Sequence, residues 1–167
     1  MSMMTYYVRL PKAELDRLLK DPKSIHDFLH PDEEPKGHDA ERRIDVEKTW
    51  DIIHFLLTGS AAAVEGPLNN VVRGGREIGD EDVGYGPARY LTPEEVAKAA
   101  TALSQIPFEK LWKRLDIKAM KKADVYMSES LRDDEWHRGW VKRYYEPLRK
   151  FFGEAAAAHE AVILYLG

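Results

Sequence analysis

Cysteine is absent from the 167 residues of this sequence. The absence excludes disulfide bonds, thiol catalysis and zinc sites built from cysteine. Long apolar runs are missing too, since none approaches the roughly 18 residues that a membrane-spanning helix needs. The first residues lack the basic and apolar regions of a signal peptide. We therefore expect a soluble, cytoplasmic protein with no membrane partner.

The sequence also has no excess of positive charge. It contains 29 Asp and Glu against 25 Lys and Arg, which gives a net charge of −4. Nucleic-acid binding depends on basic side chains that neutralise phosphates, so we expect no nucleic-acid partner. Hydrophobic residues make up 44% and charged residues 32%, which is typical of a globular domain. We expect residues 1–167 to form a single domain.

The most informative segment that is present runs from Ile44 to Gly59 and reads IDVEKTWDIIHFLLTG. Asp45 suits the N-cap of a helix, and Gly59 suits the left-handed residue that ends one. Apolar side chains cover both sides of this predicted helix, namely Val46, Trp50, Ile53 and Leu57 on one and Ile52, Phe55 and Leu56 on the other. We expect a mostly buried helix that contacts the C-terminal strand through Trp50, Ile53 and Leu57.

One narrow polar line runs along this helix. Its members are Glu47, Asp51, His54 and Thr58, whose spacings of four, three and four place them on one face. In a structural interpretation, Thr58 bonds a carbonyl one turn back, His54 caps a neighbouring element, and Asp51 anchors the indole N–H of another tryptophan. In a chemical interpretation, Asp51 orients His54 as a general base in a pocket. A third interpretation is a pocket that binds a ligand without chemistry.

Further candidates for ligand binding lie after this helix. Arg73-Gly74-Gly75-Arg76 offers backbone amides and two guanidiniums to a phosphate, although paired glycines after a helix also form an ordinary C-cap and turn. Tyr85 follows in the next segment. The sequence has no HExxH spacing, no Walker A motif and no GxSxG elbow, so we expect no metal and no cofactor.

The remaining pattern predicts the fold class. Strands are expected at Met3–Leu10, at Val83–Leu91 and at Ala161–Leu166, the last one central because it is fully apolar. Thr92-Pro93-Glu94-Glu95 predicts a capped helix start, and a long helix is expected from Asp133 to Phe152 with Trp136, Trp140 and Tyr144 in the core. We expect an α+β fold, with helices packed largely on one face of a small, mainly antiparallel or mixed sheet of about three or four strands.

The segment from Trp50 to Gly59, preceded by Asp45-Val46-Glu47-Lys48, resembles the signature of the YfbM-like family, a bacterial domain of unknown function. The shared pattern is Trp-Asp, then His-Phe, then Leu-Thr-Gly. The resemblance extends over essentially the whole chain, with a looser match from Arg73 to Tyr90. It implies an α+β fold and brings no established activity or catalytic residues.

Two functions follow as hypotheses. The first is a small binding or interaction protein, whose partner is an unidentified protein or small molecule. The second is an enzyme with a pocket around Asp51, His54 and Thr58, to which Arg73, Arg76 and Tyr85 also belong. The two hypotheses differ at His54, because a general base must face a concave, accessible pocket.

Overall fold

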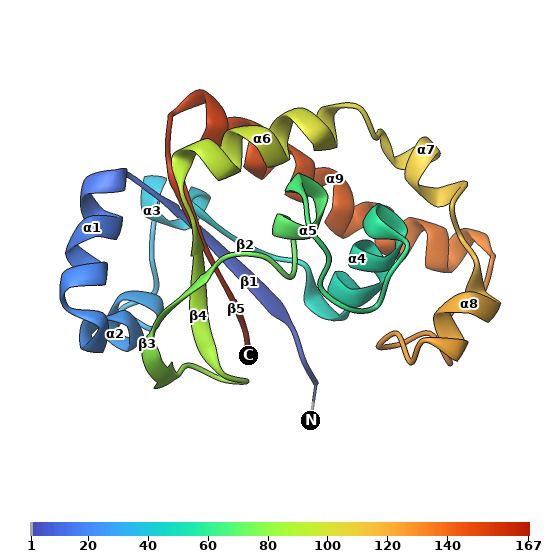
Figure 1. The fold of residues 1–167 in the computed structure, drawn as a ribbon, viewed down its shortest axis with the longest axis horizontal. Helices are drawn as coiled ribbons and strands as arrows, with labels where there is room; N and C mark the ends of the chain where they lie inside the picture. The colour runs from blue at the N-terminus through green and yellow to red at the C-terminus, as the bar shows by residue number, and fades with distance from the viewer. Residues whose placement is uncertain (1) are drawn as a thin grey trace.

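The computed structural model describes residues 2–167 and shows a twisted sheet between two layers of helices (Figure 1). The sheet has five strands in the order β2-β1-β5-β4-β3, and every neighbouring pair is antiparallel. The strands are β1 (Thr5–Leu10), β2 (Arg43–Asp45), β3 (Arg76–Asp82), β4 (Pro87–Leu91) and β5 (Ala161–Leu166). The α+β class is confirmed, whereas the expected three or four strands are too few.

Both strands that the sequence pattern missed lie at the edges of the sheet. β2 has only three residues, too few for an alternating pattern. β3 reads REIGDED and buries only Ile78, so it carries almost no hydrophobic signal. The expected strand Val83–Leu91 is wrong in its first half, because Asp82 Oδ1 accepts hydrogen bonds from the amides of Gly84 (2.8 Å) and Gly86 (3.0 Å). Those bonds make residues 83–86 the turn between β3 and β4.

The C-terminal strand is central, as expected. β5 pairs with β1 on one side and with β4 on the other, and its first five residues are buried. Alternate side chains point to opposite faces of a strand. Val162 and Leu164 therefore enter one hydrophobic cluster, while Ile163 and Tyr165 enter a second one on the other face.

Helices cover both faces of the sheet, with the larger set on one of them (Figure 1). The smaller layer contains α1 (Lys12–Lys20) and α2 (Ile25–Leu29), and α3 (His38–Glu41) precedes β2. The larger layer contains α4 (Trp50–Thr58), α5 (Pro67–Asn70), α6 (Pro93–Ser104), α7 (Phe108–Trp112), α8 (Ile117–Lys122) and α9 (Glu135–Ala157). Within residues 2–167, no helix has the length and apolar character needed to cross a membrane.

The start of α6 follows the sequence closely, but the aromatic stripe of α9 does not. Thr92 and Glu95 form the expected capping box of α6. On α9, the buried face contains Val141, Tyr145, Leu148 and Phe152, whereas Trp136 is 69% exposed. Four residues advance an α-helix by about 40° more than one full turn. A stripe with a spacing of four therefore rotates across the surface, and the placement of Trp136 in the core is wrong.

Candidate functional site

The segment from Ile44 to Gly59 forms three elements instead of one helix. β2 ends at Asp45, a 3-10 turn (η2) spans Glu47–Thr49, and α4 begins at Trp50. Asp45 Oδ1 accepts a hydrogen bond from the Glu47 amide at 3.0 Å, just before the 3-10 turn, and it does not cap α4, whose N-cap residue is Thr49. Gly59 has the expected left-handed conformation (φ 74°) and ends α4.

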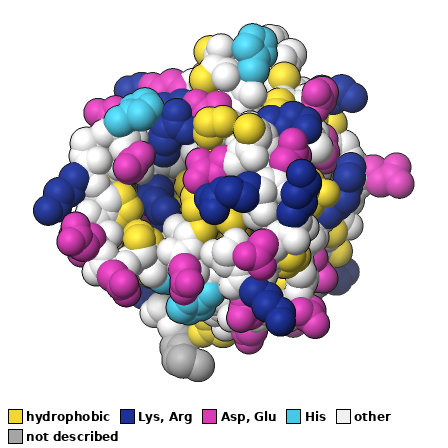
Figure 2. Space-filling model, turned by 90° about the vertical axis from the view of Figure 1, so that its left-hand side faces the viewer, with side chains coloured by type: hydrophobic (Ala, Val, Ile, Leu, Met, Phe, Trp, Pro, Cys, Tyr) yellow, Lys and Arg dark blue, Asp and Glu magenta, His cyan; other side chains and the backbone are white. Residues whose placement is uncertain are grey.

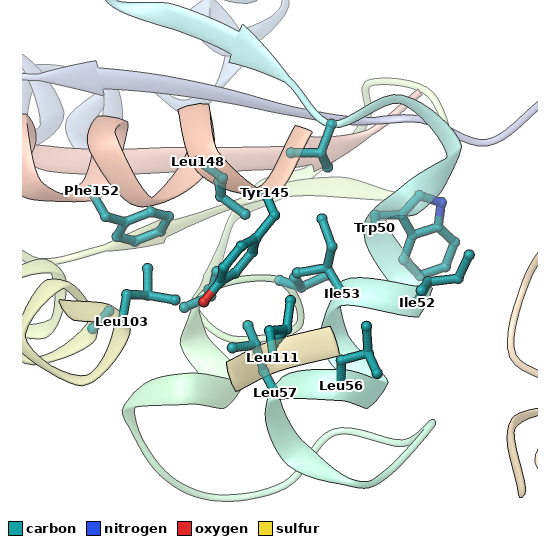
Figure 3. Close-up of a cluster of buried hydrophobic side chains, with 14 of the residues drawn as sticks. Trp50, Ile52, Ile53, Leu56, Leu57, Leu103, Leu111, Tyr145, Leu148 and Phe152 are labelled. Carbon is teal, nitrogen blue, oxygen red and sulfur yellow. The ribbon is translucent and has the colours of Figure 1, made fainter. Parts of the chain in front are cut away.

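α4 is almost completely buried, but its neighbours differ from those expected. It packs mainly against α5, α7 and α9, whereas we expected contact with the C-terminal strand, whose Val162 and Leu164 belong to the same hydrophobic cluster. Figure 3 shows Ile53 and Leu57 facing the same cluster as Leu111 of α7 and Tyr145 of α9. At its start, the Trp50 indole donates to the Met3 carbonyl at 3.1 Å, which ties α4 to the chain just before β1.

Asp51 connects α4 to two distant segments. Its Oδ1 accepts from Arg73 Nη2 at 2.7 Å, and its Oδ2 accepts from the Tyr126 amide at 2.8 Å. The Arg73 guanidinium lies 5.3 Å from the centre of the Trp50 ring, and the Tyr126 ring stacks on Trp50 at 5.8 Å. A buried carboxylate needs such partners, because its charge is expensive to remove from water. The three groups around Trp50 are therefore held in one fixed arrangement.

His54 is fully buried and does not meet Asp51, whose two oxygens face Arg73 and Tyr126. The His54 Nε2 atom lies 2.9 Å from the Ala62 carbonyl, and the Thr58 hydroxyl donates to the His54 carbonyl at 2.9 Å. Burial lowers the pKa of His54, and the Ala62 hydrogen bond partly opposes this shift. A carbonyl can only accept, so Nε2 carries a proton and donates it to Ala62, which fastens the loop after α4.

Glu47 faces α9, away from Asp51. Its Oε2 accepts from the Trp140 indole at 3.2 Å, and its hydrogen bond with the Tyr144 hydroxyl raises the pKa of Tyr144. The four members of the polar line therefore have separate surroundings. Thr58 and His54 bond the backbone, Asp51 bonds a guanidinium and an amide, and Glu47 bonds aromatic side chains.

A cavity of about 360 Å³ lies beside Trp50 and brings together part of the predicted set. It contains Arg73 and Tyr85, whereas Arg76 lies outside it, with its guanidinium 3.8 Å from Glu95. The complete lining comprises Thr5, Trp50, Ala63, Val72, Arg73, Glu77, Tyr85, Gly86, Pro87, Arg89 and Leu166. We call this space the Trp50 cavity. Glu47, Asp51, His54 and Thr58 do not line it.

Arg89 is the lining residue that sequence reasoning missed. It is the middle residue of β4. The local sequence pattern of a strand does not mark an arginine there as a ligand-binding residue. Its guanidinium donates to the carbonyls of Gly74 (2.8 Å) and Val72 (3.0 Å). Burial lowers the pKa of Arg89, and repulsion from the nearby Arg73 guanidinium adds to this shift. Two positive charges from separate segments therefore lie close together at this cavity.

The Arg73–Arg76 turn does not cradle a phosphate through its Gly74 amide. That amide donates to the Asn69 carbonyl at 3.0 Å, as in an ordinary helix end. Gly75 is required by the fold, because it has φ 94° and a Cβ there would lie 2.8 Å from the Tyr90 carbonyl oxygen. What this turn contributes to the cavity is the Arg73 side chain.

A second cavity of about 730 Å³ lies by α1, α2 and α3. Its charged lining is balanced, with acidic residues such as Glu14 and Glu33 beside basic ones such as Arg42 and Arg43. Figure 2 shows the side of the molecule that carries α1 and α2, where acidic and basic side chains are interspersed. In the part of the chain that the structure describes, no three His, Asp or Glu side chains converge as a metal site would require.

Comparisons with known proteins agree with the resemblance carried by Trp50–Gly59. Protein YfbM of Escherichia coli (strain K12) is 27% identical over 134 residues, which cover 75% of this chain and 74% of the relative. The crystal structure of a protein of unknown function, YfbM from Escherichia coli, matches with a TM-score of 0.69 at 22% identity, over 98% of this chain and 99% of that one. The family model described as "Domain of unknown function (DUF1877)" matches residues 1–165. The chain therefore belongs to the DUF1877, or YfbM-like, family, whose function is unknown.

Proposed function

We propose that this protein binds a small molecule with a carboxylate or phosphate group in the Trp50 cavity. The observation that carries the proposal is the pair of guanidiniums, from Arg73 and Arg89, which line one cavity together with Trp50 and Tyr85. A volume of about 360 Å³ lies within the range of small-ligand sites, which are concave and hold a few convergent polar groups.

Arg73 is suited to hold an oxyanion because its position is fixed before binding. Asp51 engages only Nη2, and the Trp50 ring supports the guanidinium face. A guanidinium has five donors in a planar fork and can pair with an oxyanion through two of them. Arg89 supplies a second positive charge in the cavity lining. Tyr85 is 41% exposed and offers an aromatic ring to the rest of the ligand.

Binding without chemistry is the function that this geometry supports. A general base must reach the proton that it removes, and the His54 side chain has no exposed surface. The Trp50 cavity contains no histidine, and its one carboxylate belongs to Glu77. We further propose that the protein acts in the cytoplasm as a single domain over residues 1–167, which cell fractionation and limited proteolysis would test.

Calorimetric titration tests the binding proposal with inorganic phosphate and a panel of small mono- and dicarboxylates as probes. We expect at least one probe to bind. Arg73→Lys should raise the dissociation constant of that probe about tenfold, because lysine lacks the guanidinium fork. Arg76→Ala is the matched control, since it removes a positive charge that lies nearby but outside the cavity. The proposal fails if no probe binds at millimolar concentration, or if Arg76→Ala weakens binding as much as Arg73→Lys.

A further inference from the structure

Trp136 is the most exposed large hydrophobic side chain of residues 2–167, at 69%. It lies in the first turn of α9, directly after Asp133, Asp134 and Glu135, all of which are exposed. One full turn further along α9, Trp140 is half-buried. We call the surface formed by Trp136, His137, Trp140 and the three acidic residues the Trp136 patch.

The aromatic rings of this patch are ordered without any partner. Trp136 stacks on Trp140 with 6.0 Å between ring centres, and the His137 ring meets Trp136 edge-on at 4.8 Å. His137 is fixed by a 2.8 Å contact between its Nδ1 and Asp134 Oδ1. Trp140 is fixed by its hydrogen bond to Glu47. Binding of a partner to Trp136 therefore costs little free energy for ordering this side chain.

Elsewhere in the chain, comparable groupings of an aromatic ring and a carboxylate are completed by an arginine. Arg73 lies over Trp50 and pairs with Asp51. Two further cases repeat the arrangement, namely Arg76 over Tyr90 with Glu95, and Arg138 over Phe108 with Glu109. The guanidinium is attracted to the ring face and to the carboxylate at once.

The Trp136 patch has the ring and the carboxylates but no such arginine. Within residues 2–167, no lysine or arginine lies over the Trp136 ring. The nearest basic residues along the chain are engaged elsewhere, since Arg132 donates to the carbonyls of Glu129 and Leu131, and Arg138 pairs with Glu109. The acidic charges of Asp133 and Glu135 thus border an aromatic face that no cation covers.

We propose that the Trp136 patch is an interaction surface for an arginine-bearing, flexible peptide segment of a partner protein. The arginine guanidinium would lie on the free face of Trp136 and pair with a carboxylate at the start of α9. Arginine fits better than lysine, because its planar guanidinium both stacks on an aromatic ring and forks onto a carboxylate. The proposal is independent of the Trp50 cavity and its ligand.

Nuclear magnetic resonance tests this surface directly, because the four tryptophans give separate indole N–H signals. The probe is a short glycine-serine peptide with two arginines, and the control peptide carries citrulline at both positions. We expect a saturable shift of the Trp136 and Trp140 signals with the arginine peptide. Citrulline has nearly the shape of arginine without its charge, so its peptide should bind at least about fivefold more weakly.

Two variants complete the experiment. Trp136→Ala should raise the dissociation constant of the arginine peptide at least about fivefold. It should leave the thermal midpoint unchanged, since the side chain is mostly exposed. Tyr85→Ala removes another exposed aromatic ring, outside the patch, and should leave the peptide affinity unchanged. The proposal is overturned by equal binding of the citrulline peptide, by no saturable shift, or by shifts that depend on protein concentration alone, which would indicate contact with a second copy.

Discussion

At the scale of single residues, Asp51 shows how one carboxylate is stabilised by two unlike donors. Its side chain is buried, and it accepts one hydrogen bond from a charged guanidinium and another from a backbone amide. Removal of one partner from such an arrangement leaves the other group unsatisfied, which costs more than the arrangement itself contributes. Asp51 is therefore expected to be a stability residue that also positions Arg73 for the Trp50 cavity.

Asp51→Asn tests this role. The new amide presents a donor to one of its former partners, so we expect a loss of about 1–3 kcal/mol in the free energy of unfolding, measured by urea denaturation. Asp16→Asn is the matched control, because Asp16 forms an exposed ion pair with Lys12 and should have almost no effect. Equal losses in the two variants would contradict the central role of Asp51.

His54 predicts a pH dependence of stability. Burial lowers its pKa in the folded protein, so below about pH 6.5 the unfolded chain binds a proton that the folded chain does not. The free energy of unfolding should therefore fall as the pH decreases from 7 to 5, by up to about 1.4 kcal/mol per pH unit from this group. His54→Gln cannot titrate and should flatten the curve. Parallel curves for the two proteins, measured by urea denaturation at each pH, would refute this prediction.

The candidate site was predictable only in part, because a helical pattern shows which side chains share a helix face but not which other segments they contact. The spacing of Glu47, Asp51, His54 and Thr58 identifies side chains on one helix, but their partners come from other segments. Arg73 was a candidate because of its paired glycines, although its contribution is its side chain. Arg89 reaches the same cavity through strand pairing, which no local pattern reveals.

At the scale of elements, the strength of the local signal decided what the sequence predicted. The capping box at Thr92 and the left-handed Gly59 are local chemistry, and both are confirmed. The apolar β5 strand is central because only a strand covered on both faces buries such a run. The polar strand β3 lies at an edge, where pairing with β4 and not side-chain burial defines it, so its residues gave no pattern.

Trp50→Ala tests the packing of α4. The Trp50 indole is almost fully buried among α4, Arg73 and Tyr126, so its loss should cost about 3–5 kcal/mol of unfolding free energy. Trp136→Ala makes the same chemical change at an exposed position and should have little effect. Thermal midpoints from circular dichroism would separate the two variants, and a wild-type midpoint for Trp50→Ala would show that α4 is not held by this side chain.

At the scale of the whole molecule, two hydrophobic clusters share one sheet. The larger cluster includes Tyr7 and Leu164, and the smaller one includes Val8 and Ile163, so neighbouring residues of the same strands serve different clusters. Separation of these strands would expose the side chains of both clusters to water at once. Because the inner strands β1, β5 and β4 contribute side chains to both clusters, we expect the layers to unfold together as one cooperative unit.

Leu18→Ala tests this coupling from the smaller layer. Leu18 is fully buried in α1, and its truncation should cost about 2–5 kcal/mol. Trp50, Trp112 and Trp140 all belong to the larger cluster or pack against it, and none is in the smaller one, so tryptophan fluorescence reports on the opposite face of the sheet. If the layers are coupled, the variant shifts the urea midpoint equally by fluorescence and by circular dichroism. A fluorescence midpoint that stays at the wild-type value while circular dichroism moves would mean that the α1 layer unfolds independently of the sheet.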